Sequence, residues 1–299
     1  MRWMSFRPLY LLVSAIALGF SLYGIAVFGF AYSIDFTGGS VTEYQFNKEV
    51  QVDDVVNTLQ SQGLEKWRAK DGQQLSSNKV QLKFVPEFDQ TDAQSLPAIL
   101  DGELGGKPQL LRLERVGPSL SREILEKTYI AIAIAAVGIL LWVAYQFKSL
   151  MFGISAILAM IHDSVILLGT FAWLGHLKGV EVDILFVTAM LTVLSFSVHD
   201  TIVVYDRIRE AMKRNYGVSI YDLANKALTE TMVRSVNNSL TIIFMLSALF
   251  LMGGESIKWF VFALLVGTIS GTYSSPFVAV PLLVTWEEIN RWWKFRNSK

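Results

Sequence analysis

Apolar residues gather in six long runs along the chain, and polar residues gather between them. A helix needs about 20 mostly apolar residues to cross the hydrocarbon core of a membrane. The runs occupy residues 9–30, 128–147, 150–174, 184–205, 237–253 and 257–284. The last run contains Pro276 and Pro281, and proline breaks or kinks a helix. The pattern predicts an α-helical polytopic membrane protein with six transmembrane helices, the sixth of them irregular.

The first run follows Arg2 and Arg7, as the apolar part of a signal peptide would. A cleavage site of small residues should come after the apolar part of such a peptide. The small residues Ala15 and Ala17 lie in the middle of the run instead. We therefore expect an anchor helix that is not removed.

Residues 35–127 contain no run long enough to span a membrane and show the patterns of a small domain. Alternation of apolar and polar residues indicates strands, and helical spacing of valines indicates a helix ending at Gly63. Asp71 and Gly72 are expected in the connection of a hairpin. Strands are expected at 40–46, 65–72, 78–85 and 108–117, and helices at 52–63 and 92–100, the second interrupted by Pro97. The order β-α-β-β-α-β predicts a ferredoxin-like domain.

Lysine and arginine are enriched in loops on the inner side of a membrane. They are frequent before the first run, in the loop 206–236 and in the tail after residue 285, and Lys148 lies in a tight turn on the same side. Both termini are therefore expected inside and the globular domain outside. The predicted parts are residues 1–34 with helix 1, residues 35–127 as the external domain, and residues 128–299 with helices 2–6.

The composition excludes several classes of site. Charged residues make up 17% of the chain, fewer than the roughly 25% of a soluble domain. The net charge of zero gives no indication of a nucleic-acid partner, and the absence of cysteine excludes disulfides and thiolate metal sites. The three histidines are far apart in sequence, and the external domain contains none. Neither a metal site nor an enzymatic constellation is expected.

Ionisable residues inside apolar helices are the candidates for chemistry. His162 and Asp163 lie in the third run, and His199 and Asp200 lie in the fourth. An aspartate at the centre of a membrane helix costs at least about 2.5–3.5 kcal/mol, so such residues normally face a bundle interior or water. Thr201 and Asp200 share a helix face with Ser197. This face predicts a polar stripe within the membrane.

Arg234 lies just before the fifth apolar run, at a depth similar to that of Asp200 in the inner half of the membrane. Burial and a neighbouring cation act in opposite directions on the proton affinity of a carboxylate. A carboxylate in that position can bind or release a proton when its surroundings change. The candidate ion relay therefore comprises Asp200, Arg234, His199, Asp163 and Thr201.

Structural roles are open for each of these groups. Arg234 also fits an anchor on the inner side, and Asp206 with Arg207 and Arg209 also fits a solvated helix end. The histidines His162 and His199 also fit hydrogen-bonding positions in the helix bundle. The two intramembrane aspartates and the glycines of residues 38–39 have structural alternatives as well.

Six stretches together carry a resemblance to a known family. They are IDFTGGS (34–40), ERVGPSLSREI (114–124), IHDSVILLG (161–169), SVHDTIVVYDRIRE (197–210), TMVRSVNNSLTII (231–243) and GTYSSPFVAVPL (271–282). In this order and spacing they resemble the SecD/SecF family of bacterial protein-export membrane proteins over essentially the whole chain. The fourth and sixth stretches point to the SecF branch, which is one half of a resistance-nodulation-division transporter.

The resemblance implies a function and a set of partners. The expected function is to use the proton or sodium motive force, together with SecD, to promote late stages of polypeptide translocation across the bacterial cytoplasmic membrane. Implied partners are SecD, the SecYEG translocon with YajC and YidC, the translocating preprotein and membrane lipids. The coupling ion is the only expected cofactor, and no enzymatic activity is expected. The external domain would be periplasmic and both termini cytoplasmic.

The resemblance also assigns residues. By position, Asp200 matches an essential intramembrane aspartate and Arg234 matches a required arginine at the start of the fifth helix. His199 stands where the family often has asparagine, so it either joins the relay or fills a hydrogen-bonding position. The junction between membrane and domain is assigned to one motif: Asp35, Phe36, Thr37, Gly38 and Gly39.

Three other functions are left open. The first is export of a small molecule or lipid, which a deep apolar pocket in the external domain would favour. The second is an intramembrane hydrolase that uses Asp163 and Asp200, which would require the two carboxylates to face each other. The third is an inert assembly scaffold, which would tolerate substitution of Asp200 and Arg234.

Overall fold

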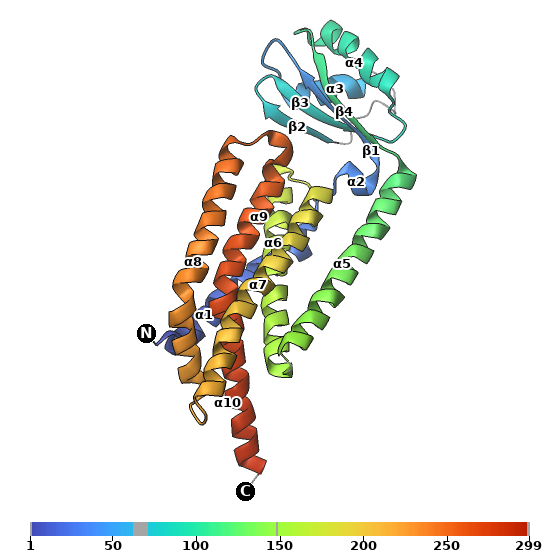
Figure 1. Ribbon diagram of the computed structural model, residues 1–299. Coiled ribbons are helices and arrows are strands. Elements are labelled where there is room, and N and C mark those ends of the chain that lie inside the picture. Colours follow the sequence, from blue (N-terminus) through green and yellow to red (C-terminus); the bar gives the residue numbers. More distant parts are fainter. Residues whose placement is uncertain (1, 62–70, 148, 298–299) are drawn as a thin grey trace. The chain divides into compact units, whose positions relative to one another are not determined.

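A computed structural model describes residues 2–61, 71–147 and 149–297 of the chain (Figure 1). It divides into two compact units. The first unit, here called the membrane unit, comprises Met1–Ala31 and Ala131–Lys299, and the second comprises Tyr32–Ile130. Each unit is described by itself.

The membrane unit is helical throughout. Its elements are η1 Trp3–Phe6, α1 Arg7–Phe28, the greater part of α5 Pro118–Phe147, α6 Leu150–Lys178, α7 Ile184–Arg214, α8 Ile220–Met252, α9 Glu255–Ser274, η3 Ser275–Ala279 and α10 Val280–Asn297. Six helices of the described chain are long and apolar enough to cross a membrane. The prediction of six spans is confirmed.

Two of the helices extend well beyond the predicted membrane runs. α7 continues from the apolar run to Arg214, and α8 already begins at Ile220. Most of the expected loop 206–236 is therefore helix. Charged residues at helical spacing explain the extension, since Arg209 pairs with Asp206 at 3.0 Å and Arg214 pairs with Glu210 at 2.6 Å.

The sixth span is irregular where proline predicts it. α9 ends at Ser274, and the five residues Ser275–Ala279 form a π-helix that contains Pro276. Proline has no backbone N–H to donate to the preceding turn, and π-helical turns of this kind are frequent at functional sites. Pro281 lies in the first turn of α10, where proline is tolerated.

Small residues let the central helices approach closely. A Cβ atom at Gly169 of α6 would lie 2.3 Å from the Cβ of Ser21 in α1. A Cβ atom at Gly267 of α9 would lie 2.0 Å from a methyl group of Val193 in α7. Close backbone approach at small residues is how membrane helices gain packing energy. It places α6, α7 and α9 close enough for their short polar side chains to meet.

The second unit is a four-stranded antiparallel sheet with two packed helices. Its elements are α2 Ile34–Thr37, β1 Gly39–Gln45, α3 Val52–Ser61, β2 Asp71–Ser76, β3 Lys79–Phe84, α4 Gln90–Glu103 and β4 Gln109–Val116. The strand order is β2-β3-β1-β4, and every neighbouring pair is antiparallel. The predicted element order β-α-β-β-α-β is confirmed.

One hydrophobic core holds this unit together. It joins strand residues such as Phe84 to Leu59 of α3 and Leu96 of α4. The Tyr44 hydroxyl of β1 donates to the Ala93 carbonyl of α4 at 3.0 Å, which satisfies a polar group inside the core. Among the described residues of the whole chain, no group of three or more histidine, aspartate or glutamate side chains could hold a metal ion.

The predicted hairpin connection is wrong. Asp71 and Gly72 lie in β2, and the turn is at residues 77–78. Gly72 serves close packing instead of a turn, since a Cβ atom there would lie 2.7 Å from a methyl group of Val52. The first part of the predicted strand 65–72, together with Gly63 and Lys148, lies outside the described residues.

The second predicted helix is longer than expected. α4 extends from Gln90 to Glu103 and continues through Pro97. A reciprocal capping box between Asp89 and Asp92 fixes its start, two residues before the predicted one.

Candidate ion site in the membrane unit

Short polar side chains from four helices meet inside the membrane unit. His162 and Asp163 come from α6, and Ser197, Asp200 and Thr201 come from α7. The remaining polar members are Arg234 and Ser235 of α8, Ser270 and Ser274 of α9, and Ser275 of η3. Together they surround two carboxylates that differ in their hydrogen bonding.

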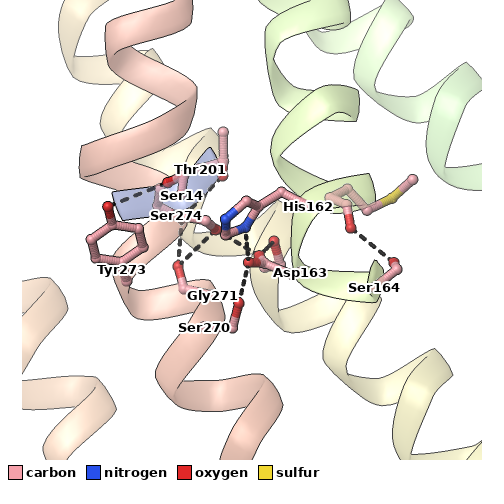
Figure 2. A network of polar contacts seen from close by, with 12 residues as sticks. Ser14, His162, Asp163, Ser164, Thr201, Ser270, Gly271, Tyr273 and Ser274 are labelled. Carbon is pink, nitrogen blue, oxygen red and sulfur yellow. Dashed lines mark hydrogen bonds and ion pairs between the residues drawn. The ribbon is translucent and has the colours of Figure 1, made fainter. Parts of the chain in front are cut away.

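Asp163 is fully buried and fully hydrogen-bonded (Figure 2). Its Oδ1 accepts from the Ser270 hydroxyl at 2.6 Å and lies 3.1 Å from Nδ1 of His162. Its Oδ2 accepts from the hydroxyls of Ser197 and Ser274, each at 2.6 Å. Each carboxylate oxygen thus has two partners, and the shell joins α6, α7 and α9.

Asp200 is also buried but has a different shell. Its side chain is 6% exposed, and its Oδ1 accepts from the Ser235 hydroxyl of α8 at 2.7 Å. Its Oδ2 is buried and has no hydrogen-bond partner among the described residues. Buried carboxylate oxygens are rarely left without a partner, and the exceptions gather at functional sites. Asp200 is therefore the carboxylate with free binding capacity.

A hydroxyl pair links the surroundings of the two carboxylates. Thr201, next to Asp200 in the chain, lies with its Oγ1 3.0 Å from the Oγ of Ser275. Ser275 follows Ser274, which belongs to the Asp163 shell. The π-helix that begins here is also held by α7, since the Tyr205 hydroxyl donates to the Ala279 carbonyl at 2.9 Å. The hydroxyl pair therefore joins α7, through Thr201, to the irregular part of the sixth span, through Ser275.

Arg234 is exposed on α8 and lies near Asp200 without forming an ion pair with it. It precedes Ser235, the hydrogen-bond donor to Asp200, and its charge acts on Asp200 through space. No ion pair within 4.0 Å joins Arg234 and Asp200 in the described structure. Arg234 instead lines a cleft of about 420 Å³ between α7 and α8, with Val203, Asp206, Arg207, Glu210, Glu230 and Thr231.

The charged groups around this cleft are largely paired. Arg207 forms ion pairs with Glu230 at 2.5 Å and with Glu210 at 2.6 Å. Asp206 pairs with Arg209, whose side chain also donates to the Gln146 carbonyl at the end of α5. These contacts agree with the interpretation of Asp206–Glu210 as a charged helix end.

The histidines differ in placement. His199 is exposed on α7, and its charge acts on Asp200 through space. His162 is buried beside Asp163. The hydrolase alternative needs two facing carboxylates, whereas Asp163 and Asp200 lie in separate hydrogen-bond shells.

The junction motif lies in the second unit. The Ser33 hydroxyl accepts from the Asp35 backbone at 3.2 Å and caps the short helix α2, which also contains Phe36 and Thr37. Gly38 and Gly39 follow with φ angles of 69° and 138°, which favour glycine. A Cβ atom at Gly39 would also lie 2.7 Å from the Phe84 carbonyl. Both glycines are thus required by local geometry.

Sequence reasoning placed Ser197 on a polar helix face but missed the other two serines that surround Asp163. Ser270 and Ser274 are spaced by four residues in an apolar run, which places them on one helix face. That spacing was a usable signal. Ser235 was obscured because it lies in a stretch already rich in polar residues.

Comparisons with known proteins decide the family. Residues 101–289 match the family model "Protein export membrane protein SecD/SecF, C-terminal", and residues 23–50 match the SecD/SecF GG motif. The chain belongs to the SecD/SecF family. The GG motif match contains Gly38 and Gly39, the two glycines that follow α2. The longer match contains both intramembrane carboxylates and Arg234.

Relatives within the SecD/SecF family are SecF proteins. The chain is 44% identical over 291 residues to the protein translocase subunit SecF of Thermobaculum terrenum, covering 93% of this chain and 91% of the relative. It is 34% identical over 303 residues to the SecF subunit of Anaerolinea thermophila, covering 98% and 96%.

Solved SecDF structures share the fold. A crystal structure of SecDF, a translocon-associated membrane protein from Thermus, matches with a TM-score of 0.85 and 30% identity over 96% of this chain. SecDF in a super-membrane-facing form matches with a TM-score of 0.67 and 29% identity over 99% of this chain. The chain spans only 39% and 40% of those two SecDF chains.

Proposed function

We propose that this chain is the SecF subunit of a bacterial protein translocase, and that its membrane unit couples ion flow to polypeptide export. The observation that carries the ion-coupling step is Asp200, a buried carboxylate with one partnered and one unpartnered oxygen in the described structure, with Arg234 nearby. The SecF relatives and the SecDF structures support the protein-export role. Nothing favours the exporter of small molecules or lipids, and no enzymatic role is proposed.

In the proposed cycle Asp200 takes a proton from the outer side and releases it to the inner side. One elementary charge crossing the membrane potential releases about 2.3 kcal/mol per 100 mV, so a few protons are sufficient for a domain motion. Arg234 balances the charged form of Asp200 in one state and withdraws in the other. Thr201 and Asp163 complete the polar path. His199 is adjacent to Asp200 in the chain, so a change in the charge of His199 would affect proton binding at Asp200. Sodium is the alternative coupling ion.

SecD is the proposed partner, because α8 exposes polar groups that lipid would not tolerate. Exposed polar residues recur along one face of α8 at Arg234, Asn237, Asn238 and Thr241. Unsatisfied polar groups are costly in the hydrocarbon region. The match covers only 39% and 40% of the two SecDF chains, so those chains contain a second part beyond the matched one. SecD is expected to supply that part and cover α8.

The remaining assignments follow from the family. The second unit is proposed to be a ferredoxin-like periplasmic domain that holds the emerging preprotein, and both termini are proposed to be cytoplasmic. The SecYEG translocon, with YajC and YidC, is the proposed larger assembly in the inner membrane. Residues 1–34, 35–127 and 128–299 keep their predicted assignments in this scheme.

Preprotein export by membrane vesicles tests the proposal. Vesicles carrying this chain with SecD are compared with and without a proton gradient, for the wild type and for Asp200→Asn and Arg234→Met. The gradient-dependent gain should disappear in both variants while the complex still copurifies. A matched control is Asp222→Asn, which changes an exposed carboxylate at the start of α8. Full gain in Asp200→Asn at normal protein level would contradict the proposal.

A further inference from the structure

His162 is the one buried histidine among the three in the chain. Its side chain is 5% exposed, whereas His176 and His199 are exposed on α6 and α7. Its Nδ1 lies 3.1 Å from Oδ1 of Asp163. Its Nε2 is buried and has no hydrogen-bond partner among the described residues. A buried polar atom without a partner inside a helix bundle calls for a ligand or a function.

We propose that Nε2 of His162 is a second proton-binding site of the membrane unit, in addition to Asp200. When Nδ1 donates its hydrogen to Asp163, Nε2 carries the lone pair and is the atom that accepts a proton. Histidine is the side chain whose unperturbed titration falls near neutral pH. The proposal rests on the proposed function for its role in export, but proton binding itself does not depend on that role.

The surroundings fit a site that changes charge. With neutral His162 the pair with an ionised Asp163 carries one negative charge, and with protonated His162 it carries none. The three serine hydroxyls of the shell hold the carboxylate in place in both states. A proton gained at Nε2 therefore removes a net charge from the interior of the unit, where an uncompensated charge is expensive.

Few other titratable groups face His162. From α9, the Tyr273 ring lies 6.4 Å from the imidazole, and its hydroxyl donates to the Tyr10 carbonyl of α1 at 2.9 Å. On α7, the titratable residues nearest in sequence to Ser197, which donates to Asp163, are His199 and Asp200. η3 contains no titratable residue, and those of α10 begin at Glu287. Asp163 is thus the only carboxylate within hydrogen-bonding distance of His162 in the described structure.

The site is connected to Asp200 through adjacent serines. Ser274 donates to Asp163, and the next residue, Ser275, pairs with Thr201 beside Asp200. A change of charge at His162 changes the strength of the hydrogen bonds to Asp163, including the one from Ser274. The next residue, Ser275, contacts Thr201, which is adjacent to Asp200 in the chain. Two proton-binding groups in one connected shell can then act in sequence.

Histidine NMR on the complete chain in complex with SecD tests proton binding directly. The chain has three histidines, so a sample labelled at its histidines, with SecD unlabelled, gives three imidazole signals. His176→Gln and His199→Gln assign them by loss of one signal each. We expect the His162 signal to change from the neutral to the protonated form when the sample is brought from high to low pH within the range in which the complex stays folded. Asp163→Asn should shift this titration far more than Asp222→Asn does. A His162 signal that stays in one state across this range would overturn the proposal.

The pH profile of export tests the role of the site. His162→Gln keeps a donor for Asp163 but cannot carry charge, so the step that His162 contributes to the pH dependence of the gradient-driven gain should be lost. His176→Gln is the matched control on the same helix and should keep the wild-type profile. If His162 titrates but His162→Gln leaves the profile unchanged, its proton has no part in coupling. If wild-type vesicles show no gradient-driven gain, the proposed function fails, and the NMR titration still decides proton binding.

Discussion

Asp163 and Asp200 are both buried aspartates of the same helix bundle, yet their surroundings are opposite. Asp163 has four partners from three helices, two for each oxygen. Asp200 has one serine partner and one oxygen without a partner in the described structure. A carboxylate whose acceptor sites are all used is held in one arrangement. A carboxylate with a free oxygen has capacity to bind an ion or to exchange partners.

The difference divides the roles of the two carboxylates: Asp163 fixes how α6, α7 and α9 pack, whereas Asp200 has an oxygen that can take a new partner. The proton proposed at His162 is gained at Nε2, outside the hydrogen bonds that hold Asp163. Asp200 lies at the contact between α7 and α8, where Ser235 donates to it and Ser275, His199 and Arg234 lie nearby. In the proposed cycle a change at Asp200 would reach α8 through Ser235 and the π-helix through Thr201 and Ser275. The predictions below test this division, beginning with the largest expected effect.

Removal of the Asp163 carboxylate should destabilise the protein most. Asp163→Ala leaves three serine hydroxyls and the His162 ring without their shared partner in the interior. Loss of one member of such a buried charged network costs about 3–5 kcal/mol. Unfolding in mild detergent, followed by circular dichroism against denaturant, should show this loss. Asp200→Ala should cost clearly less, and an equal loss in both variants would contradict the division.

The two serine partners should differ in their effect on function. Ser235→Ala removes the hydrogen bond that α8 donates to Asp200, whereas Ser274→Ala leaves Asp163 with three partners. Each change should cost about 1 kcal/mol of stability. The gradient-dependent export gain should fall strongly in Ser235→Ala and only slightly in Ser274→Ala. Both gains are measured in vesicles with equal amounts of complex, and the reverse order would assign the responsive carboxylate to Asp163.

The sequence was sufficient to find both carboxylates, because an aspartate in an apolar run is conspicuous. It was also sufficient for six membrane-competent helices and for the order of strands and helices along the small domain, since both follow from periodicity. It could not rank Asp163 against Asp200. The partners Ser270 and Ser274 lie more than 100 residues from Asp163 in the chain, and only the packing of α9 on α6 brings them together.

Two errors had local causes. The loop predicted at 206–236 is mostly helix. At the end of α7 its charged residues form ion pairs three or four positions apart, and such pairs stabilise a helix that continues beyond the apolar run. Gly72 was assigned to a turn because glycine is common there, whereas its neighbour in space, Val52, requires a residue without a side chain. Neither competing cause is visible until the elements are packed.

A change in close packing should sharpen the contrast between the Asp163 shell and the responsive Asp200. Gly267→Ala places a methyl group against Val193 where α9 meets α7, with a contact of 2.0 Å that the helices must relieve. Overpacking of this kind costs about 1–3 kcal/mol. Thermal unfolding of the purified complex should report the loss. Gly138→Ala on α5, where nothing lies within 4 Å of the new Cβ atom, is the control and should leave stability unchanged.

The link between the two shells should give the smallest effect. Thr201→Val removes the hydroxyl that meets Ser275 while nearly keeping the side-chain volume. The lost hydrogen bond should cost about 1 kcal/mol, and the export gain should fall partially because Asp200 keeps its contact with Ser235. Thr201→Ser should restore the gain. Thr188→Val is the matched control on α7, since the Thr188 hydroxyl bonds only to the Ile184 carbonyl of its own helix. Equal effects of the Thr201 and Thr188 variants would show that the hydroxyl pair does not connect the carboxylates.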